Sequence, residues 1–367
     1  MSQRPFDVAQ GKIGTALLWI LAGTSIVLLI YEAWTLIGSV LLPLLRNPLA
    51  IQTDFHYYYQ AAERFSSDRS LLYLATDDVI AGFAYPPPAI VPFMAMTRLP
   101  LGVALLLLTI ASYLALVLVV HRWLVYLRRN GFTSDLATRT AILLIVLASG
   151  PVYMNAIFGQ VNAFVLLSAV AFVTMAEGAP IVAGASLAAG IALKIYPVLM
   201  AAMVLWNRRV ARALMWTAVA GIAIVIVLLP IVPLDAYRSF LDALSTRIDK
   251  TALHITNQSL VGFIERFRVA PELFLNWTGR EAVTVSPLLR GINAVVMAVA
   301  VIALWQRISA RGNPAVASTA ALMALVAVIA PLGWGHTYVM VLPLMVLQLI
   351  NMREARPITA ILIFLCV

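Results

Sequence analysis

Asp54, Lys194 and His336 are side chains whose surroundings in the sequence could support chemistry. Asp54 is followed by Phe, His and three Tyr residues, and a carboxylate at a membrane boundary in such a setting could act as a general base. Lys194 is the only ionisable residue between Glu177 and Arg208, and an isolated lysine suits an anionic ligand. His336 follows Trp334 in a Gly-Trp-Gly-His turn and could face the same site as Asp54.

Each of these residues also has a plain structural interpretation. Thr53 and Asp54 precede a predicted amphipathic helix ending near Phe65, so Asp54 could belong to a helix cap. Lys194 could extend its ammonium group to the membrane interface. A histidine beside an anchoring tryptophan could simply lie at that interface. These alternatives stay open from the residues alone.

Other polar motifs could bind a substrate. Gly159-Gln160-Val-Asn162 closes a predicted turn between two spans, and its amides could bind hydroxyl groups or merely close the turn. A second motif, Asn257-Gln258-Ser259-Leu260, is followed by Arg266 and Arg268, which suits a phosphate-bearing ligand as well as a solvated helix. Tyr85 begins a Tyr-Pro-Pro-Pro run that cannot be regular helix.

Several classes of site are missing from the sequence. The four histidines do not form a zinc-protease motif, and the single cysteine, Cys366, has no partner, so we expect no metal site. No glycine-rich nucleotide-binding loop is present either.

The composition identifies the kind of protein that must position these residues. Of the 367 residues, 62% are hydrophobic and 11% are charged, and the net charge is +9. Soluble domains are about 45–50% apolar and about 25% charged. We therefore predict an all-α polytopic membrane protein and expect no nucleic-acid partner.

Uncharged runs mark the expected membrane spans, because a crossing needs roughly 17–25 apolar residues. The first run is too long for a cleaved signal peptide and predicts a retained span. Two polar segments, 46–88 and 235–287, separate the others as long loops. The expected spans lie in Ile13–Tyr31, Leu101–Val120, Thr140–Ala176 (two), Ala213–Leu234, Gly291–Gln306 and Gly312–Met352 (two).

The basic residues predict the orientation of the chain. If the short basic clusters face the cytoplasm, that side carries 13 basic and four acidic residues. The opposite side, with the two long loops, carries 12 basic and 11 acidic residues. Such a bias agrees with the positive-inside rule and puts both loops outside.

This orientation requires the chain to cross and return between Glu177 and Arg208. Lys194-Ile-Tyr-Pro197 divides that stretch into apolar runs of 16 and 13 residues. We therefore expect two shortened helices that meet at a turn, since Pro197 prevents continuation of the helix. With this pair the predicted number of segments is about eleven; one long helix through Lys194 is the alternative. A final span from Pro357 is cut off at Val367, so we expect that a C-terminal part is missing.

Taken together, the motifs resemble glycosyltransferase family 87 of the GT-C superfamily. The resemblance rests on six motifs in family order. They are Asp54-Phe-x-x-Tyr-x-x-Ala61, Phe83-x-Tyr85-Pro86-Pro87, Gly159-Gln160-x-Asn162, Lys194-x-x-Pro197, Asn257-Gln258-Ser259-Leu260 and Pro331-x-x-Trp334-x-His336. Ala330 and Thr337 depart from the family's late motif, where serine and a second histidine are common.

The resemblance implies a single GT-C membrane domain over 1–367 in a bacterial plasma membrane. It implies transfer of a sugar, typically mannose, from a polyprenyl-monophosphate donor to a glycolipid or glycan acceptor, with inversion and without a cofactor. Asp54 would be the catalytic base, with His336 beside it. Lys194, Arg266 and Arg268 would bind the donor phosphate. Tyr85, Gln160, Asn162, Asn257, Gln258 and Trp334 would bind substrate.

Three other functions compete with this one. A transporter or lipid flippase would share the many spans and broken helices, although no inverted repeat is visible. An enzyme of the same superfamily could use a different sugar, such as a pentose. A structural membrane subunit would lack catalysis.

Overall fold

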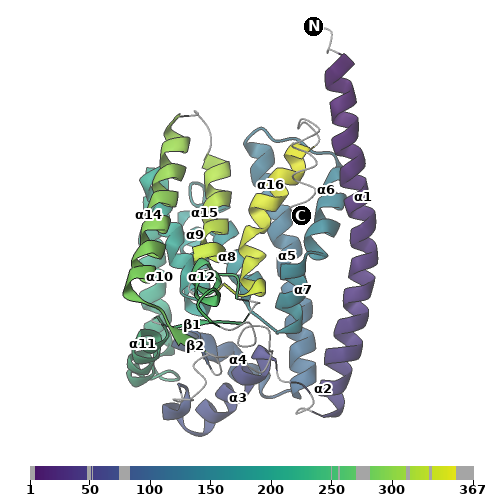
Figure 1. The fold of residues 1–367 in the computed structure, drawn as a ribbon. Coiled ribbons are helices and arrows are strands. Elements are labelled where there is room, and N and C mark those ends of the chain that lie inside the picture. The colour runs from purple at the N-terminus through teal and green to yellow at the C-terminus, as the bar shows by residue number, and fades with distance from the viewer. Residues whose placement is uncertain are drawn as a thin grey trace.

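The computed structural model describes residues 5–47, 51, 53–73, 83–248, 250–254, 257–269, 282–310, 315–329 and 333–352. Helices dominate this part of the chain, and its two strands form one antiparallel pair (Figure 1). One set of helices stands side by side as a bundle (Figure 1). They are α1 (Pro5–Leu36), α5 (Leu101–Arg129), α6 (Leu136–Leu147), α7 (Gly150–Ile157), α8 (Asn162–Met175), α9 (Pro180–Leu193), α10 (Ala211–Leu228), α14 (Pro287–Ala310), α15 (Ala315–Ile329) and α16 (Leu342–Met352).

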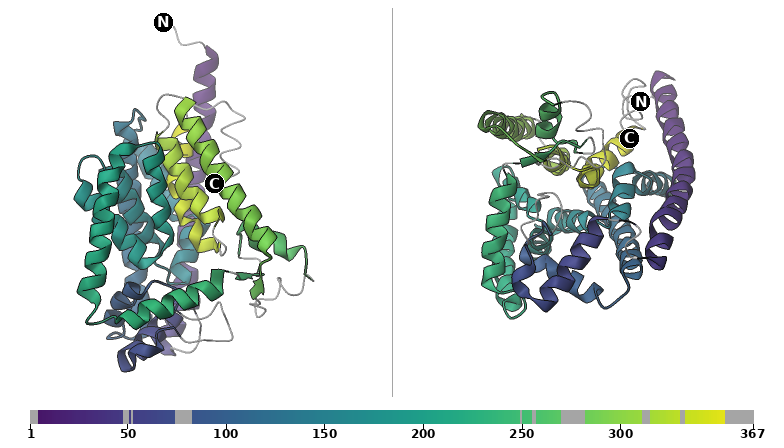
Figure 2. Two further views of the ribbon diagram at one scale, coloured as in Figure 1. Left: turned by 90° about the vertical axis from the view of Figure 1, so that its left-hand side faces the viewer. Right: turned by 60° about the horizontal axis from the view of Figure 1, so that its bottom comes forward.

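A second set of elements gathers at one end of the bundle, the lower end in Figure 1. Helix α11 runs across this end, as the left view of Figure 2 shows. The elements there are α2 (Leu42–Arg46), α3 (Asp54–Ser67), α4 (Ile90–Met96), α11 (Leu234–Ile248), β1 (Lys250–Ala252), α12 (Leu260–Arg266) and β2 (Ala282–Thr284), with 3₁₀ turns η2 (Arg69–Leu71) and η3 (Pro87–Ala89).

Four segments in the described part are long and apolar enough to cross a membrane. They are Lys12–Arg46, Leu101–Arg129, Arg208–Leu228 and Gly335–Met352. The bent pair α6 and α7 would make a fifth, and six shorter apolar helices accompany them. The prediction of a helical membrane protein is confirmed, whereas the number of about eleven segments stays a prediction.

The first span is longer than the uncharged run that predicted it. Helix α1 continues through the π-turn Ile37–Leu41 into α2, so the segment reaches Arg46 rather than Tyr31. Glu32 does not end the helix because its side chain faces the protein, with 8% of the residue exposed. The prediction that the first span ends at Tyr31, which rested on the position of charged residues, is therefore wrong.

The third uncharged stretch, 140–176, contains a break that the sequence pattern did not predict. Helices α6 and α7 meet at an angle of 49°. Pro151 lies in the first turn of α7 and has no N–H for a continuing helix. The next turn, between α7 and α8, is the predicted Gly-Gln-Val-Asn turn.

The two long loops contact each other at the lower end. The rings of Tyr73 and Phe240 are 5.8 Å apart, and Arg69 Nη1 of the first loop donates to the carbonyl oxygen of Pro230, just before the second loop, at 2.8 Å. The C-terminal ends of α5 and α14 and the N-terminal ends of α6 and α15 lie at the opposite end of the bundle (Figure 1). Arg128 and Arg129 in the last turn of α5 therefore lie far from the two loops.

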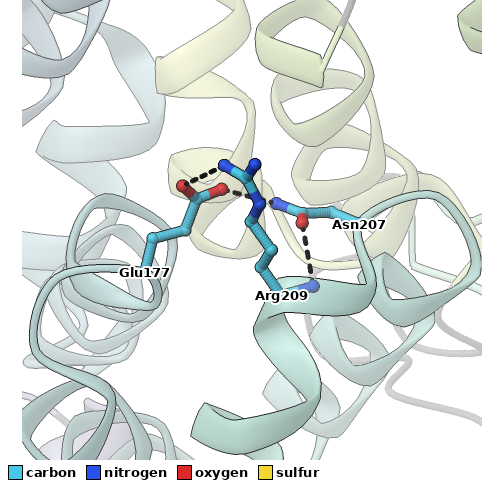
Figure 3. Close-up of polar contacts among 3 residues, drawn as sticks. All are labelled: Glu177, Asn207 and Arg209. Carbon is cyan, nitrogen blue, oxygen red and sulfur yellow. Dashed lines mark hydrogen bonds and ion pairs between the residues drawn. The ribbon is translucent and has the colours of Figure 1, made fainter.

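The predicted break at Lys194 is confirmed. Helix α9 ends at Leu193, and a 3₁₀ helix, η4, spans Tyr196–Leu205 with Pro197 in its first turn. Beyond η4, Arg209 pairs with Glu177 at 3.2 Å, and the Asn207 amide also donates to Glu177 (Figure 3). Because Glu177 and Arg209 are neighbours, the chain leaves one end of the bundle and returns to it. One long helix through Lys194 is excluded.

Candidate active site

Asp54 is the first residue of α3, at the end of the bundle where the two loops meet. Thr53 occupies the N-cap position, but its side chain makes no capping hydrogen bond. The Asp54 carboxylate is half-buried and lies at the N-terminal end of α3, where the helix dipole is positive.

The α7–α8 turn approaches Asp54 closely because it contains a glycine. Gly159 adopts φ +63°, and a Cβ atom there would lie 2.5 Å from Cβ of Phe55. The Phe55 N–H donates to the carbonyl oxygen of Phe158 at 3.0 Å. This contact fixes the start of α3 against the turn that carries Gln160.

The Gln160 side chain connects three candidate residues. Its Nε2 donates to Asp54 Oδ2 and, at 3.0 Å, to the Tyr58 hydroxyl. Its Oε1 accepts from the Tyr85 hydroxyl at 2.7 Å and from Lys194 Nζ at 2.9 Å. Gln160 is 2% exposed, so these are protein contacts rather than solvent contacts.

Asn162 is the second amide of the turn and is fully buried. Its Oδ1 accepts from Lys194 Nζ at 2.8 Å and from the Tyr196 hydroxyl at 2.9 Å. Its Nδ2 donates to the backbone carbonyl of His336 at 3.1 Å. One side chain thus joins the turn at Lys194 to the segment that carries His336.

Lys194 lies in the turn between α9 and η4, where its ammonium group meets two amide oxygens. The nitrogen also lies 4.8 Å from the centre of the Tyr85 ring, within range of a cation–π contact. An ammonium has three N–H donors, and Gln160 and Asn162 use two of them within the described part of the chain. The third can serve an anion.

Tyr85 supplies a fixed hydroxyl donor to this group. The side chain is buried against Tyr58, with ring centres 4.5 Å apart. Burial, followed by the neighbouring Tyr58 and Asp54, raises the pKa of Tyr85 well above its ordinary range. Tyr85 therefore keeps its proton at any physiological pH and holds the oxygen of the Gln160 amide.

His336 lies in the 3₁₀ turn η6 (Gly335–Val341) and is 5% exposed. Its ring meets that of Phe158 edge to face, with centres 6.1 Å apart. Its backbone oxygen is the atom that binds Asn162, so the structure brings His336 to the same turn as Gln160.

The Asn257 motif lies beside this group and ties the second loop to the segment before His336. The buried Asn257 amide donates to Thr251 Oγ1 at 3.0 Å and to the Ala252 carbonyl at 2.8 Å. Its Oδ1 accepts from the Gly333 N–H at 2.9 Å. These bonds favour a structural role for Asn257 over substrate contact.

The remaining predicted residues are peripheral to the Gln160 network. Arg266 donates to backbone carbonyls of the loop, including that of Asn257 at 2.7 Å. Arg268 pairs with Glu265 at 3.4 Å and is largely exposed. Gln258 is exposed, and its backbone N–H donates to Gly333 at 2.7 Å. Trp334 forms a backbone bridge with Asn257.

Two members of the network, Tyr58 and Tyr196, were not among the predicted site residues, although Tyr58 stands in the first of the six motifs. Tyr58 follows Asp54 by four residues, so the helical pattern of α3 placed it on the same face. Tyr196 follows Lys194 by two residues and reaches Asn162. The spacing of Tyr58 was a usable signal, whereas nothing in the sequence indicated the direction of the Tyr196 hydroxyl.

No cluster of three or more His, Cys, Asp or Glu side chains that could hold a metal ion occurs within the described ranges.

A comparison with protein-family models matches residues 83–288 to glycosyltransferase family 87. The match covers more than half of the chain. The chain belongs to glycosyltransferase family 87. Tyr85, Gln160, Asn162, Lys194 and the Asn257 motif fall inside the matched range, whereas Asp54 and His336 lie outside it. No curated protein and no solved structure matches the chain.

Family membership and the apolar helices together make the protein a membrane glycosyltransferase of family 87. For a glycosyltransferase of this family, the Gln160 network is the best candidate for the active site in the described part of the chain. Its Gln160 and Asn162 amides join the Asp54 carboxylate, the Lys194 ammonium group and the segment that carries His336.

Proposed function

We propose that the protein transfers a sugar from a polyprenyl-monophosphate donor to a hydroxyl group of a lipid-linked or glycan acceptor. The observation that carries the proposal is the shared amide: Asp54 and Lys194 hydrogen-bond to opposite ends of Gln160. A transferase needs a base for the acceptor hydroxyl and a cation for the leaving phosphate. Both groups occur here in one network.

The reaction proceeds by a single displacement. Asp54 accepts the proton of the acceptor hydroxyl while that oxygen attacks the anomeric carbon. The bond between the anomeric carbon and the phosphate oxygen breaks, and polyprenyl phosphate leaves with the added negative charge. The remaining N–H of Lys194 stabilises this charge. Attack from the face opposite the phosphate inverts the anomeric centre, and no cofactor takes part.

His336 and the second loop have supporting roles in this proposal. His336 orients the acceptor or the phosphate, and Arg266 and Arg268 add positive charge to the end of the second loop. Mannose is the sugar we propose, on the basis of the resemblance of the sequence motifs. The pentose alternative differs only in the sugar-binding contacts.

We also propose that the reaction occurs on the extracytoplasmic face of a bacterial plasma membrane. The supporting observation is the arginine pair at the end of α5, which lies at the end of the bundle away from α3 and α11 (Figure 1). Under the positive-inside rule that end faces the cytoplasm. A donor carried by a membrane lipid is accessible outside, where soluble nucleotide sugars are scarce.

The proposal is tested by incubating the purified protein with radiolabelled mannosyl-phosphoryl-polyprenol and a membrane glycolipid extract. The expected result is label in a new glycolipid or glycan, with none transferred from a nucleotide sugar. Label that remains on the donor with every acceptor fraction, while intact donor moves between the leaflets of vesicles, would instead support a flippase.

A further inference from the structure

Gln160 separates the candidate base from the candidate phosphate ligand, and its side chain has no hydrogen-bonding capacity left for a substrate. A side-chain amide offers two donors and two acceptor positions. All four are used, by Asp54, Tyr58, Tyr85 and Lys194. The residue is 2% exposed, so a sugar could reach the amide only by breaking one of these bonds.

The partners also fix the direction in which the amide points. Lys194 and Tyr85 donate, so the oxygen of Gln160 must face them. An ionised carboxylate can only accept, so the amide nitrogen must face Asp54. A flipped amide would set its N–H groups against the ammonium group and its oxygen against the carboxylate. The orientation that satisfies an anionic Asp54 is the one that satisfies a cationic Lys194.

We propose that Gln160 is a positioning residue. Its amide holds the Asp54 carboxylate and the Lys194 ammonium group apart and couples the two charges energetically. Without the amide, the opposite charges would meet in a direct ion pair. That pair would occupy the carboxylate oxygen needed by the acceptor hydroxyl and the N–H needed by the donor phosphate. Asn162 holds Lys194 from its other side and prevents the ammonium group from turning away.

The first test of this proposal does not depend on catalysis. Asp54→Asn, Lys194→Met and the double variant of the full chain are purified in detergent, and their thermal unfolding is compared with wild type. Charges coupled through Gln160 make the double variant's shift in Tm differ from the sum of the two single shifts by about 2 °C or more. Additive shifts would overturn the proposal.

The second test uses the isosteric variant Gln160→Glu and rests on the transfer reaction proposed above. The introduced carboxylate shares the site with Asp54, and two adjacent carboxylates raise each other's affinity for a proton. The acidic limb of the pH profile of kcat/KM therefore moves up by about one unit or more. The titratable and charged groups that face this pair are Tyr58 from α3, Tyr85 from the segment before η3, Lys194 from the α9–η4 turn, Tyr196 from η4 and His336 from η6.

Gln60→Glu is the matched control, because Gln60 lies on α3 and bonds to His56 rather than to Asp54. Its pH profile is expected to follow wild type. An unshifted acidic limb in Gln160→Glu would overturn the positioning role while leaving the transfer reaction intact. Absence of transfer in wild type would overturn the proposed function, and the thermal comparison would then still decide on the coupling. If Gln160→Glu does not fold, the thermal comparison of the Asp54 and Lys194 variants remains the test of the proposed coupling.

Discussion

Asp54 and Lys194 are 140 positions apart in the chain, yet they bind opposite ends of the same amide. Asp54 belongs to the first long loop, and Lys194 lies in the turn of a helical hairpin between two later helices. Their approach requires the turn of the hairpin to point toward the end of the bundle where the loops meet, with the open end of the hairpin at Glu177 and Arg209. The fold therefore creates the site by returning the chain at Lys194.

Lys194→Met is expected to weaken use of the donor. The variant removes a charged hydrogen-bond donor from the site and leaves Asn162 Oδ1 with Tyr196 alone. Charged hydrogen bonds contribute about 1.5–3 kcal/mol, so kcat/KM for the donor should fall roughly 10- to 150-fold. Steady-state kinetics with varied donor concentration measure this change. Lys250→Met, a lysine in β1, is the matched control and should stay near wild type; an equal loss in both variants would contradict the assignment.

Cysteine labelling tests the orientation of the chain. Thr53 and Thr337, which flank Asp54 and His336, are buried and would resist a reagent from either side. Exposed positions serve better: Ser67 at the end of α3, Ser245 on α11 and Thr133 between α5 and α6. With Cys366 replaced by serine, Ser67→Cys and Ser245→Cys should react with an impermeant thiol reagent in whole cells. Thr133→Cys should react only after permeabilisation, and the reverse pattern would contradict the proposed face.

Asn257→Leu is expected to destabilise the connection between the second loop and the segment before His336. The change removes the buried amide that binds the Gly333 N–H and the Ala252 carbonyl oxygen, and each buried group that loses its partner costs about 1–3 kcal/mol. Thermal unfolding in detergent should show a fall of several degrees in Tm, on the order of 4 °C. The neighbouring exposed Gln258→Leu should leave Tm nearly unchanged. Equal shifts at both positions would argue against this structural role.

The contact between α9 and α10 should tolerate very little added volume. A Cβ atom at Gly184 would lie 2.5 Å from the Ala213 carbonyl oxygen and 2.7 Å from the Thr217 nitrogen, both backbone atoms of α10. Gly184→Ala should therefore lower Tm markedly, since the two helices must separate. Gly221→Ala on α10 adds the same methyl group to open space and should be neutral or slightly stabilising. Equal Tm values for the two variants would contradict the described packing.

Charge arithmetic was enough to predict the hairpin at Lys194. The basic clusters could share one side only if the chain returned between Glu177 and Arg208, and the contact between Glu177 and Arg209 shows that it does (Figure 3). Both side chains are largely exposed, so the pair marks the return of the chain and contributes little to stability. The predicted turn at Gly159 is likewise present, because glycine readily adopts a positive φ.

Other features could not be predicted from spacing. Glu32 stands in an apolar run, and the pattern does not show that its side chain faces the protein instead of ending the span. A sequence also does not show which hydrogen-bond partners a polar side chain has in the folded protein. Asn257 and Gln160 both suited substrate binding by residue type, but their hydrogen bonds to other parts of the chain occupy the amide groups. Only the three-dimensional arrangement distinguishes a ligand from a positioning residue.

The central claim is that Asp54 is the base of a glycosyl transfer reaction, and transfer by purified Asp54→Asn tests it most directly. Asparagine keeps the size of the side chain but cannot take the proton, and loss of a general base costs about 10²–10⁴ in rate. Asp68→Asn, at an exposed acid of the same loop, is the matched control. We predict loss of transfer in Asp54→Asn with Tm within a few degrees of wild type, and near-normal transfer in Asp68→Asn. Near-normal transfer by folded Asp54→Asn protein would contradict the assignment.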